Sequence, residues 1–246
     1  LLTSSTDMGL SSSQRGVLLC DKVLKEEFVH KVRNVLMEKD ISVEIVYCDV
    51  SERNKNYKIV EECYKALDKN SVGRDGFFIS MGGGVITDLG GFVASTWLRG
   101  INYISIPTTL LGIVDASIGG KCGINRVNSK GNLIKNTIGS FYFPSMIISD
   151  IDFLKTLKPR EWKSALGEII KHGIIGDVEI LNILEGMKYD MSYSLGQENL
   201  PNTFRLIEKS IEVKKNIIDE DLMDIGKRSV LNLGHTFAHA IESQFS

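Results

Sequence analysis

The chain has few cysteines, and their spacing argues against the usual cysteine-based architectures. Its 246 residues include four cysteines, Cys20, Cys48, Cys63 and Cys122, with no CxxC pair among them. Cysteines placed so far apart argue against a cysteine-rich metal site and against a disulfide scaffold. We therefore expect a protein that works in a reducing compartment.

The sequence also lacks a strong net charge and long apolar runs. A formal net charge of −2 leaves no basic footprint, so nucleic acid is not an expected partner. The longest apolar runs, such as residues 146–148, are far too short to cross a bilayer. The polar opening, residues 3–13, is neither a signal-peptide core nor an arginine-rich transit peptide. We expect a cytoplasmic protein without a membrane partner.

Apolar runs typical of strands alternate with helical patterns in the first 150 residues. The strand-like segments are 16–20, 42–47, 77–81 and 103–106. The helical segments between them are 24–39, 57–67 and 85–98. Such alternation implies parallel βαβ units.

From Arg160 onward the pattern is helical throughout. The sequence therefore predicts an α/β nucleotide-binding domain with a Rossmann-like parallel sheet over residues 1–150. An all-α domain that binds metal and substrate, and that is incomplete, is predicted over residues 151–246.

A glycine turn, Gly82 to Gly84, follows a buried strand and opens a helix. Glycines without Cβ let the backbone approach a pyrophosphate at the positive helix N-terminus. The turn is not a GxGxxG motif, so a simple tight connection is the alternative interpretation. Asp88, in the same helix, is explained on that alternative by the helix dipole.

A second polar cluster follows the fourth predicted strand. It combines the hydroxyls of Thr108 and Thr109 with Asp115 and Lys121 around a glycine pair. On the alternative interpretation, Thr108 caps a helix, and Asp115 and Lys121 form a surface ion pair. The stretch is not a phosphate-binding P-loop, because Cys122 stands where that motif needs Ser or Thr.

The helical part carries candidate metal ligands. Glu168 and His172 are four residues apart, which places them on one helix face, and His235 and His239 repeat that spacing. A lone histidine on an apolar helix is usually a hydrogen-bonded core residue. Two such histidines with a helical glutamate elsewhere favour a catalytic zinc.

Together these segments resemble the 3-dehydroquinate synthase family of the sugar-phosphate cyclase superfamily. The matching stretches are 82–92, 99–100, 107–111, 115–121, 135–142, the helix around Glu168, and 232–236. We align the family motif to Lys135 and Asn136 rather than to the rival segment 130–134, because residues 138–142 follow in step.

The resemblance implies a site for each ligand. NAD would contact Asp21, Glu52, Lys55, Gly83, Gly84, Val85, Asp88, Thr108, Thr109, Lys135, Phe153 and Thr156. The phosphorylated keto-acid sugar would contact Arg99, Asp115, Lys121, Asn136, Lys171, Arg228, Asn232 and His235. Zinc, or cobalt, would be held by Glu168 and His235, with the family's third metal histidine expected beyond Ser246.

The resemblance also implies catalytic residues, His239, Asp224, Lys121 and Lys171. His239 matches a position with an acid/base role and not a metal ligand. Asp224 stands where the family has glutamate, so its carboxylate reaches one methylene less.

The expected activity is conversion of 3-deoxy-D-arabino-heptulosonate 7-phosphate to 3-dehydroquinate and phosphate by a homodimer. Three alternatives stay open at this point: an inosose or valiolone synthase, a NAD-dependent polyol dehydrogenase, and an inactive NAD-binding fragment.

Overall fold

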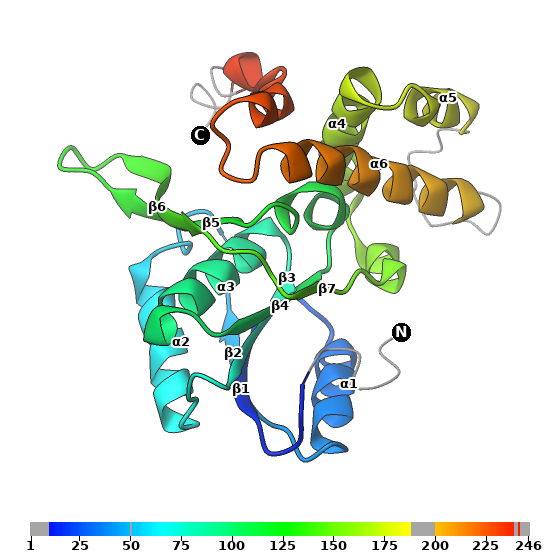
Figure 1. Ribbon diagram of the computed structural model, residues 1–246. Helices are drawn as coiled ribbons and strands as arrows, with labels where there is room; N and C mark the ends of the chain where they lie inside the picture. Colours follow the sequence, from blue (N-terminus) through cyan, green and yellow to red (C-terminus); the bar gives the residue numbers. More distant parts are fainter. Residues whose placement is uncertain (1–9, 50, 188–199, 239–240, 242–246) are drawn as a thin grey trace. The chain divides into compact units, whose positions relative to one another are not determined.

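The computed structural model describes residues 10–49, 51–187, 200–238 and 241 (Figure 1). The chain divides into two compact units, Leu1–Thr156 and Leu157–Ser246. Each unit is described by itself below.

A parallel five-stranded sheet forms the centre of the first unit. Its strands are β1 (Arg15–Asp21), β2 (Ser42–Cys48), β3 (Phe77–Gly82), β4 (Asn102–Pro107) and β7 (Met146–Ile147), in the order β2-β1-β3-β4-β7. All four pairings are parallel. The predicted Rossmann-like sheet is confirmed, and the sequence pattern located its first four strands within one or two residues of their ends.

Helices cover both faces of this sheet, because its strands bury alternate residues on opposite sides. Val17 and Leu19 of β1 pack with α2 (Tyr57–Lys69) and α3 (Gly84–Thr96). Leu18 and Cys20 pack with α1 (Glu26–Met37) on the other face. Figure 1 shows the same arrangement, with α1 on one side of the strands and α2 and α3 on the other.

The strand order reverses direction between β1 and β3. From β1 the chain crosses by α1 to β2, and from β2 it crosses back by α2 to β3 on the opposite side of β1. In open parallel sheets the crevice outside the carboxyl ends of strands at such a switch point is where ligands bind. The fold therefore places a ligand site at the ends of β1 and β3.

A two-stranded antiparallel hairpin, β5 (Lys121–Val127) and β6 (Leu133–Phe141), was not predicted from the sequence. Apart from its ends, β6 is exposed along its length, so its residues lack the apolar alternation that marks a half-buried strand. Figure 1 shows the hairpin extending away from the five-stranded sheet. Its base packs against α3, where Cys122 and Ile124 join the core.

The second unit is helical, which confirms the predicted all-α character of this region. It contains α4 (Pro159–Ile175), α5 (Glu179–Gly186), α6 (Leu200–Glu220) and a short 3-10 segment, Lys227–Asn232. Pro159 opens α4, a position where its missing N–H costs nothing. Among the described residues, no helix combines the length and the apolar character needed to span a membrane.

Candidate functional site

The glycine turn lies at the carboxyl end of β3, beside the switch point. Gly83 is the N-cap of α3, and the N–H of Thr108, just after β4, donates to the Gly82 carbonyl at 2.9 Å. A Cβ on Gly83 would lie 3.1 Å from Thr109 Cγ2, and one on Gly84 would lie 3.1 Å from Ala116 Cβ. The turn is therefore a narrow cradle in front of the helix N-terminus, which fits a pyrophosphate.

Three other residues expected at the nucleotide lie at the end of β1 and in the segment that follows β7. Asp21 ends β1, is buried, and accepts a hydrogen bond from the Val23 N–H at 3.0 Å. Phe153 lies in a 3-10 segment, Ile151–Thr156, where its ring packs edge-on against Phe28 at 4.9 Å. The Thr156 hydroxyl donates to the Phe153 carbonyl at 2.9 Å, which closes this segment.

Among the described residues of the first unit, Lys55 is the most enclosed charged side chain. Only 2% of the residue is exposed, and its ammonium contacts the Asp88 carboxylate and donates to Asn136 Oδ1 at 2.5 Å. Burying an ammonium is costly unless it is paired and hydrogen-bonded, and here a carboxylate and an amide oxygen accept from it. Lys55 thus joins the second turn of α3 to the hairpin.

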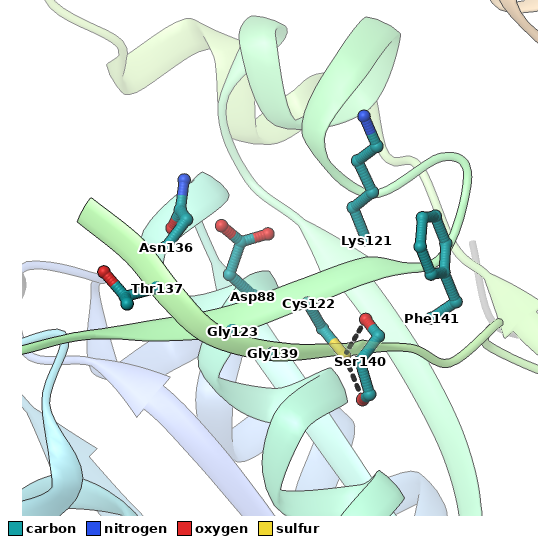
Figure 2. Close-up of a pocket in the computed structure, with 9 residues that line it drawn as sticks. All are labelled: Asp88, Lys121, Cys122, Gly123, Asn136, Thr137, Gly139, Ser140 and Phe141. Carbon is teal, nitrogen blue, oxygen red and sulfur yellow. Dashed lines mark hydrogen bonds between the residues drawn. The ribbon is translucent and has the colours of Figure 1, made fainter. Parts of the chain in front are cut away.

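A cavity of about 360 Å³ opens beside this ion pair, lined by Asp88, Lys121, Cys122, Gly123, Asn136, Thr137, Gly139, Ser140 and Phe141. Figure 2 shows the Asp88 carboxylate and the ends of Lys121 and Asn136 directed to the same side. A carboxylate, an ammonium and an amide in one hollow suit a ligand with both anionic and hydroxyl groups. The structure brings these three predicted site residues together.

Burial dominates the charge state of Asp88. It raises the pKa of this carboxyl from 3.8 to about 6, and the negative charges of Glu52 and Asp115 add to the increase, while Lys55 opposes it. Asp115 lies in a π-helical turn, Gly112–Ala116, beside the start of α3. Such turns are often found at functional sites.

Arg99 is not among the residues that line this cavity. It is exposed and follows α3, whereas the glycine turn precedes α3. A helix of 13 residues separates the two by roughly 20 Å. Its backbone has a φ of 69°, in the left-handed region, and it is followed by Gly100 with a φ of 122°.

In the second unit, one face of α4 carries an acid and a buried lysine. The Lys171 ammonium contacts Glu168 Oε2 and donates to the Leu231 carbonyl at 2.8 Å. The other carboxylate oxygen, Glu168 Oε1, lies 3.9 Å from His235 Nε2. Two ligands about 2 Å from a tetrahedral zinc lie about 3.3 Å apart, so a movement of about 0.6 Å would bring this oxygen and nitrogen to a shared divalent metal.

Arg228 lies in the 3-10 segment Lys227–Asn232 and is 3% exposed. Its guanidinium donates to the Leu222 carbonyl at 3.0 Å. The preceding loop is closed by Asp221, whose carboxylate accepts from the N–H groups of Ile225, Gly226 and Arg228 at 3.0, 2.7 and 3.1 Å. These hydrogen bonds lower the pKa of Asp221.

The other predicted residues of this unit differ in their setting. Asp224 lies in the Asp221 loop with a φ of 57°, and Asn232 is exposed at the end of the 3-10 segment. His172 is fully buried, and its Nδ1 lies 2.6 Å from the Ser210 hydroxyl of α6. His239 lies outside the described residues.

Sequence reasoning missed Lys214. This α6 lysine is only 6% exposed, and among the unit's described residues it is one of three buried cations, with Lys171 and Arg228. The sequence does not distinguish a buried lysine from an exposed one. Only the position of Lys214 on the apolar side of α6, one residue after Val213, could have predicted its burial. Its burial makes Lys214 a further candidate site residue.

Two family models match consecutive parts of the chain. The 3-dehydroquinate synthase N-terminal model matches residues 45–164, and the 3-dehydroquinate synthase C-terminal model matches residues 165–246. The chain belongs to the 3-dehydroquinate synthase family. The resemblance inferred from the motifs is thereby confirmed, and it extends upstream of the glycine turn.

Relatives with the same family name support this membership. A 3-dehydroquinate synthase of Prochlorococcus marinus (strain MIT 9515) is 39% identical over 97% of this chain and 64% of the relative. One of Clostridium kluyveri is 37% identical over 95% of this chain and 62% of the relative. The chain therefore spans a little under two thirds of the length of these curated relatives.

Solved structures agree with the fold. A 2-epi-5-epi-valiolone synthase from Streptomyces hygroscopicus subsp. jinggangensis 5008, solved with NAD+ and Zn2+ bound, matches with a TM-score of 0.83 and 27% identity, covering 98% of this chain and 64% of that one. A 2-deoxy-scyllo-inosose synthase matches with a TM-score of 0.79 and 23% identity, over 97% and 64%. The second likeness shows the fold alone.

Proposed function

We propose that the protein is a 3-dehydroquinate synthase, which converts 3-deoxy-D-arabino-heptulosonate 7-phosphate to 3-dehydroquinate and phosphate with NAD and a divalent metal, zinc or cobalt. The family models, which together match residues 45–246, are the observation that carries this proposal. The cradle at Gly83 and the cluster around Lys55 support a nucleotide site in the first unit.

NAD, when bound, takes up a hydride from one carbinol and returns it, and the metal polarises the carbinol oxygens. The glycine turn would receive the pyrophosphate, and Thr108 and Thr109 would stand beside it. Glu168 and His235 would hold the metal. Because Lys171 contacts the second oxygen of Glu168, it would fix the orientation of that carboxylate.

The chain's cations would bind the anionic groups of the substrate. Lys121 lines the cavity of the first unit, and Lys171 and Arg228 lie in the second. A flexible acyclic sugar has many conformers, so fixed charges at its phosphate and carboxylate would hold it in a reactive shape. Asp224 and His239 would move protons.

That the protein is a cytoplasmic homodimer stays a prediction, and analytical ultracentrifugation would test the dimer.

The activity test combines two readouts, phosphate released from the heptulosonate phosphate and NADH absorbance. A synthase releases phosphate without accumulating NADH, because the hydride returns to the product. Lys121→Ala should abolish most turnover, whereas Lys130→Ala, an exposed lysine at the tip of the same hairpin, should leave it unchanged. Net NADH formation would instead identify a polyol dehydrogenase.

The valiolone synthase likeness makes another sugar-phosphate cyclase the second candidate. Product analysis by NMR separates the two candidates, since only 3-dehydroquinate synthase yields a carboxylated ring. Absence of turnover, with NAD and metal both bound, would point to a binding fragment.

A further inference from the structure

The β5–β6 hairpin, which was not predicted from the sequence, contains a β-bulge. Register between β5 and β6 passes from Ile124↔Ile138 to Arg126↔Ile134, so one residue of β5 faces three of β6. The three are residues 135–137, and the one is Asn125. Such bulges redirect side chains and are found next to active sites.

Asn125 fills the gap that the bulge leaves. It is 2% exposed, and its side-chain Oδ1 accepts from the Asn136 N–H at 2.7 Å. Its Nδ2 donates to the Glu52 carbonyl at 2.8 Å and to Glu52 Oε2 at 2.7 Å. Its own N–H donates to the Lys55 carbonyl at 2.7 Å.

Asn136 is thereby held at both ends. Its N–H is bound by Asn125, and its Oδ1 is bound by Lys55. Its φ of 51° is a left-handed conformation that asparagine tolerates better than most residues but that still requires support. Every one of these supports comes from Asn125 or from residues 52–55, the loop between β2 and α2.

We propose that Asn125 is a positioning residue that transmits the position of the 52–55 loop to Asn136. This rests on the proposed function and on the family resemblance, which implies that Glu52 and Lys55 contact NAD and that Asn136 contacts the sugar. NAD that holds Glu52 and Lys55 in place would fix Asn136 through Asn125. Cofactor binding thus prepares one of the substrate contacts.

Hydrogen exchange on the purified chain tests this coupling. In the wild type, NAD at about ten times its Kd should slow exchange in peptide 133–141 about fivefold, and it should also protect peptide 82–88. Asn125→Asp keeps the size and the acceptor for Asn136 but has no N–H for Glu52 and repels its carboxylate. In this variant, at about ten times its own Kd, the protection of 133–141 should fall below about twofold while that of 82–88 remains.

Asn128→Asp is the matched control. Asn128 lies on the same hairpin, and its Oδ1 only accepts from the N–H groups of Lys130 and Asn132 at 2.9 Å, which an aspartate also does. This variant should behave as the wild type.

Equal protection of 133–141 in Asn125→Asp would overturn the coupling, because a direct contact between NAD and the hairpin would then suffice. No protection of 133–141 in the wild type, with 82–88 protected, would also overturn it. Failure of the wild type to bind NAD would contradict the proposed function instead. If Asn125→Asp does not fold, Asn125→Ser replaces it, and loss of folding in both would show a requirement for folding and overturn the positioning role.

Discussion

At the scale of single residues, burial rather than residue type determines the chemistry. Of all the lysines in the described part of the chain, Lys55 is the least exposed, at 2%. Its ammonium contacts Asp88 and Asn136. Asp88 in turn carries a raised pKa because desolvation outweighs that ammonium. Neither the burial of Lys55 nor the raised pKa of Asp88 can be predicted from the residue type alone.

The carboxyl of Asp88 should titrate near pH 6, as followed by its 13C chemical shift. Lys55→Met should move the midpoint up, because a favourable charge is lost, and Glu52→Gln should move it down. Between about pH 4 and pH 6 the folded state holds a proton that the unfolded state has released. The contribution of Asp88 to the free energy of unfolding therefore decreases as the pH rises from about 4 to about 6. A midpoint near 4 in the wild type would contradict the burial argument.

Gly83→Ala should weaken NAD binding at least about tenfold, as measured by calorimetry. The backbone there, with φ of −75° and ψ of −174°, is open to any residue, so the reason for glycine is space. An added Cβ would press on Thr109 at 3.1 Å and occupy the cradle. Gly186→Ala, where a Cβ meets nothing within 4 Å, is the control and should bind NAD as the wild type does. Unchanged affinity in Gly83→Ala would remove this turn from the nucleotide site.

At the scale of elements, the site residues lie where regular structure stops. The nucleotide candidates follow the ends of β1, β3 and β4, and Asn136 lies at the bulge of β6. In the second unit, Arg228 follows a loop that Asp221 closes with three backbone hydrogen bonds. Short elements and their ends therefore position the chemistry.

Asp221→Asn should lower the melting temperature at pH 7 and should also reduce kcat/KM, because the loop that presents Arg228 loses its carboxylate acceptor. Because folding lowers the pKa of Asp221, the ionised carboxylate stabilises the folded state above the ordinary carboxyl pKa. This stabilisation is lost as the pH falls through the folded-state pKa. Melting curves of wild type and variant should therefore converge on acidification. A difference that is the same at pH 7 and pH 3 would show that the charge of Asp221 does not matter.

At the scale of the whole molecule, the two units carry different donor sets. The cradle and the cavity lie within Leu1–Thr156, and the pairing of Glu168 with His235 lies within Leu157–Ser246. A ligand stabilises the part of a protein that it binds, by about 2.7 kcal/mol at 100 times its Kd.

NAD and zinc should therefore protect different amides from hydrogen exchange. NAD should slow exchange mainly in residues 77–90, 102–112 and 133–141, and zinc mainly in 165–175 and 227–238. Glu168→Gln should remove the zinc effect and leave the NAD effect in place, because a neutral amide is a poor zinc ligand. If zinc protected the first unit equally in both proteins, the metal assignment to Glu168 and His235 would be wrong.

Sequence alone was sufficient for the parallel sheet, the helical second unit and the family. Periodic burial leaves a period-two or period-3.6 pattern in the sequence, and a glycine turn or an i, i+4 pair can be identified without coordinates. The hairpin could not be found this way, because β6 buries too little surface to impose a pattern.

The contacts of Lys55, Asn125 and Lys214 were decided by the tertiary structure. Lys55 and Asn136 are 81 residues apart, as Glu52 and Asn125 are 73 apart, and no local periodicity links residues at such separations. The alignment of Lys135 and Asn136 to the family motif, against the rival segment 130–134, stays a prediction, which the contact of Asn136 with Lys55 supports. Local spacing specifies elements, whereas burial and long-range hydrogen bonds, which exist only in the folded chain, determine which side chains act together.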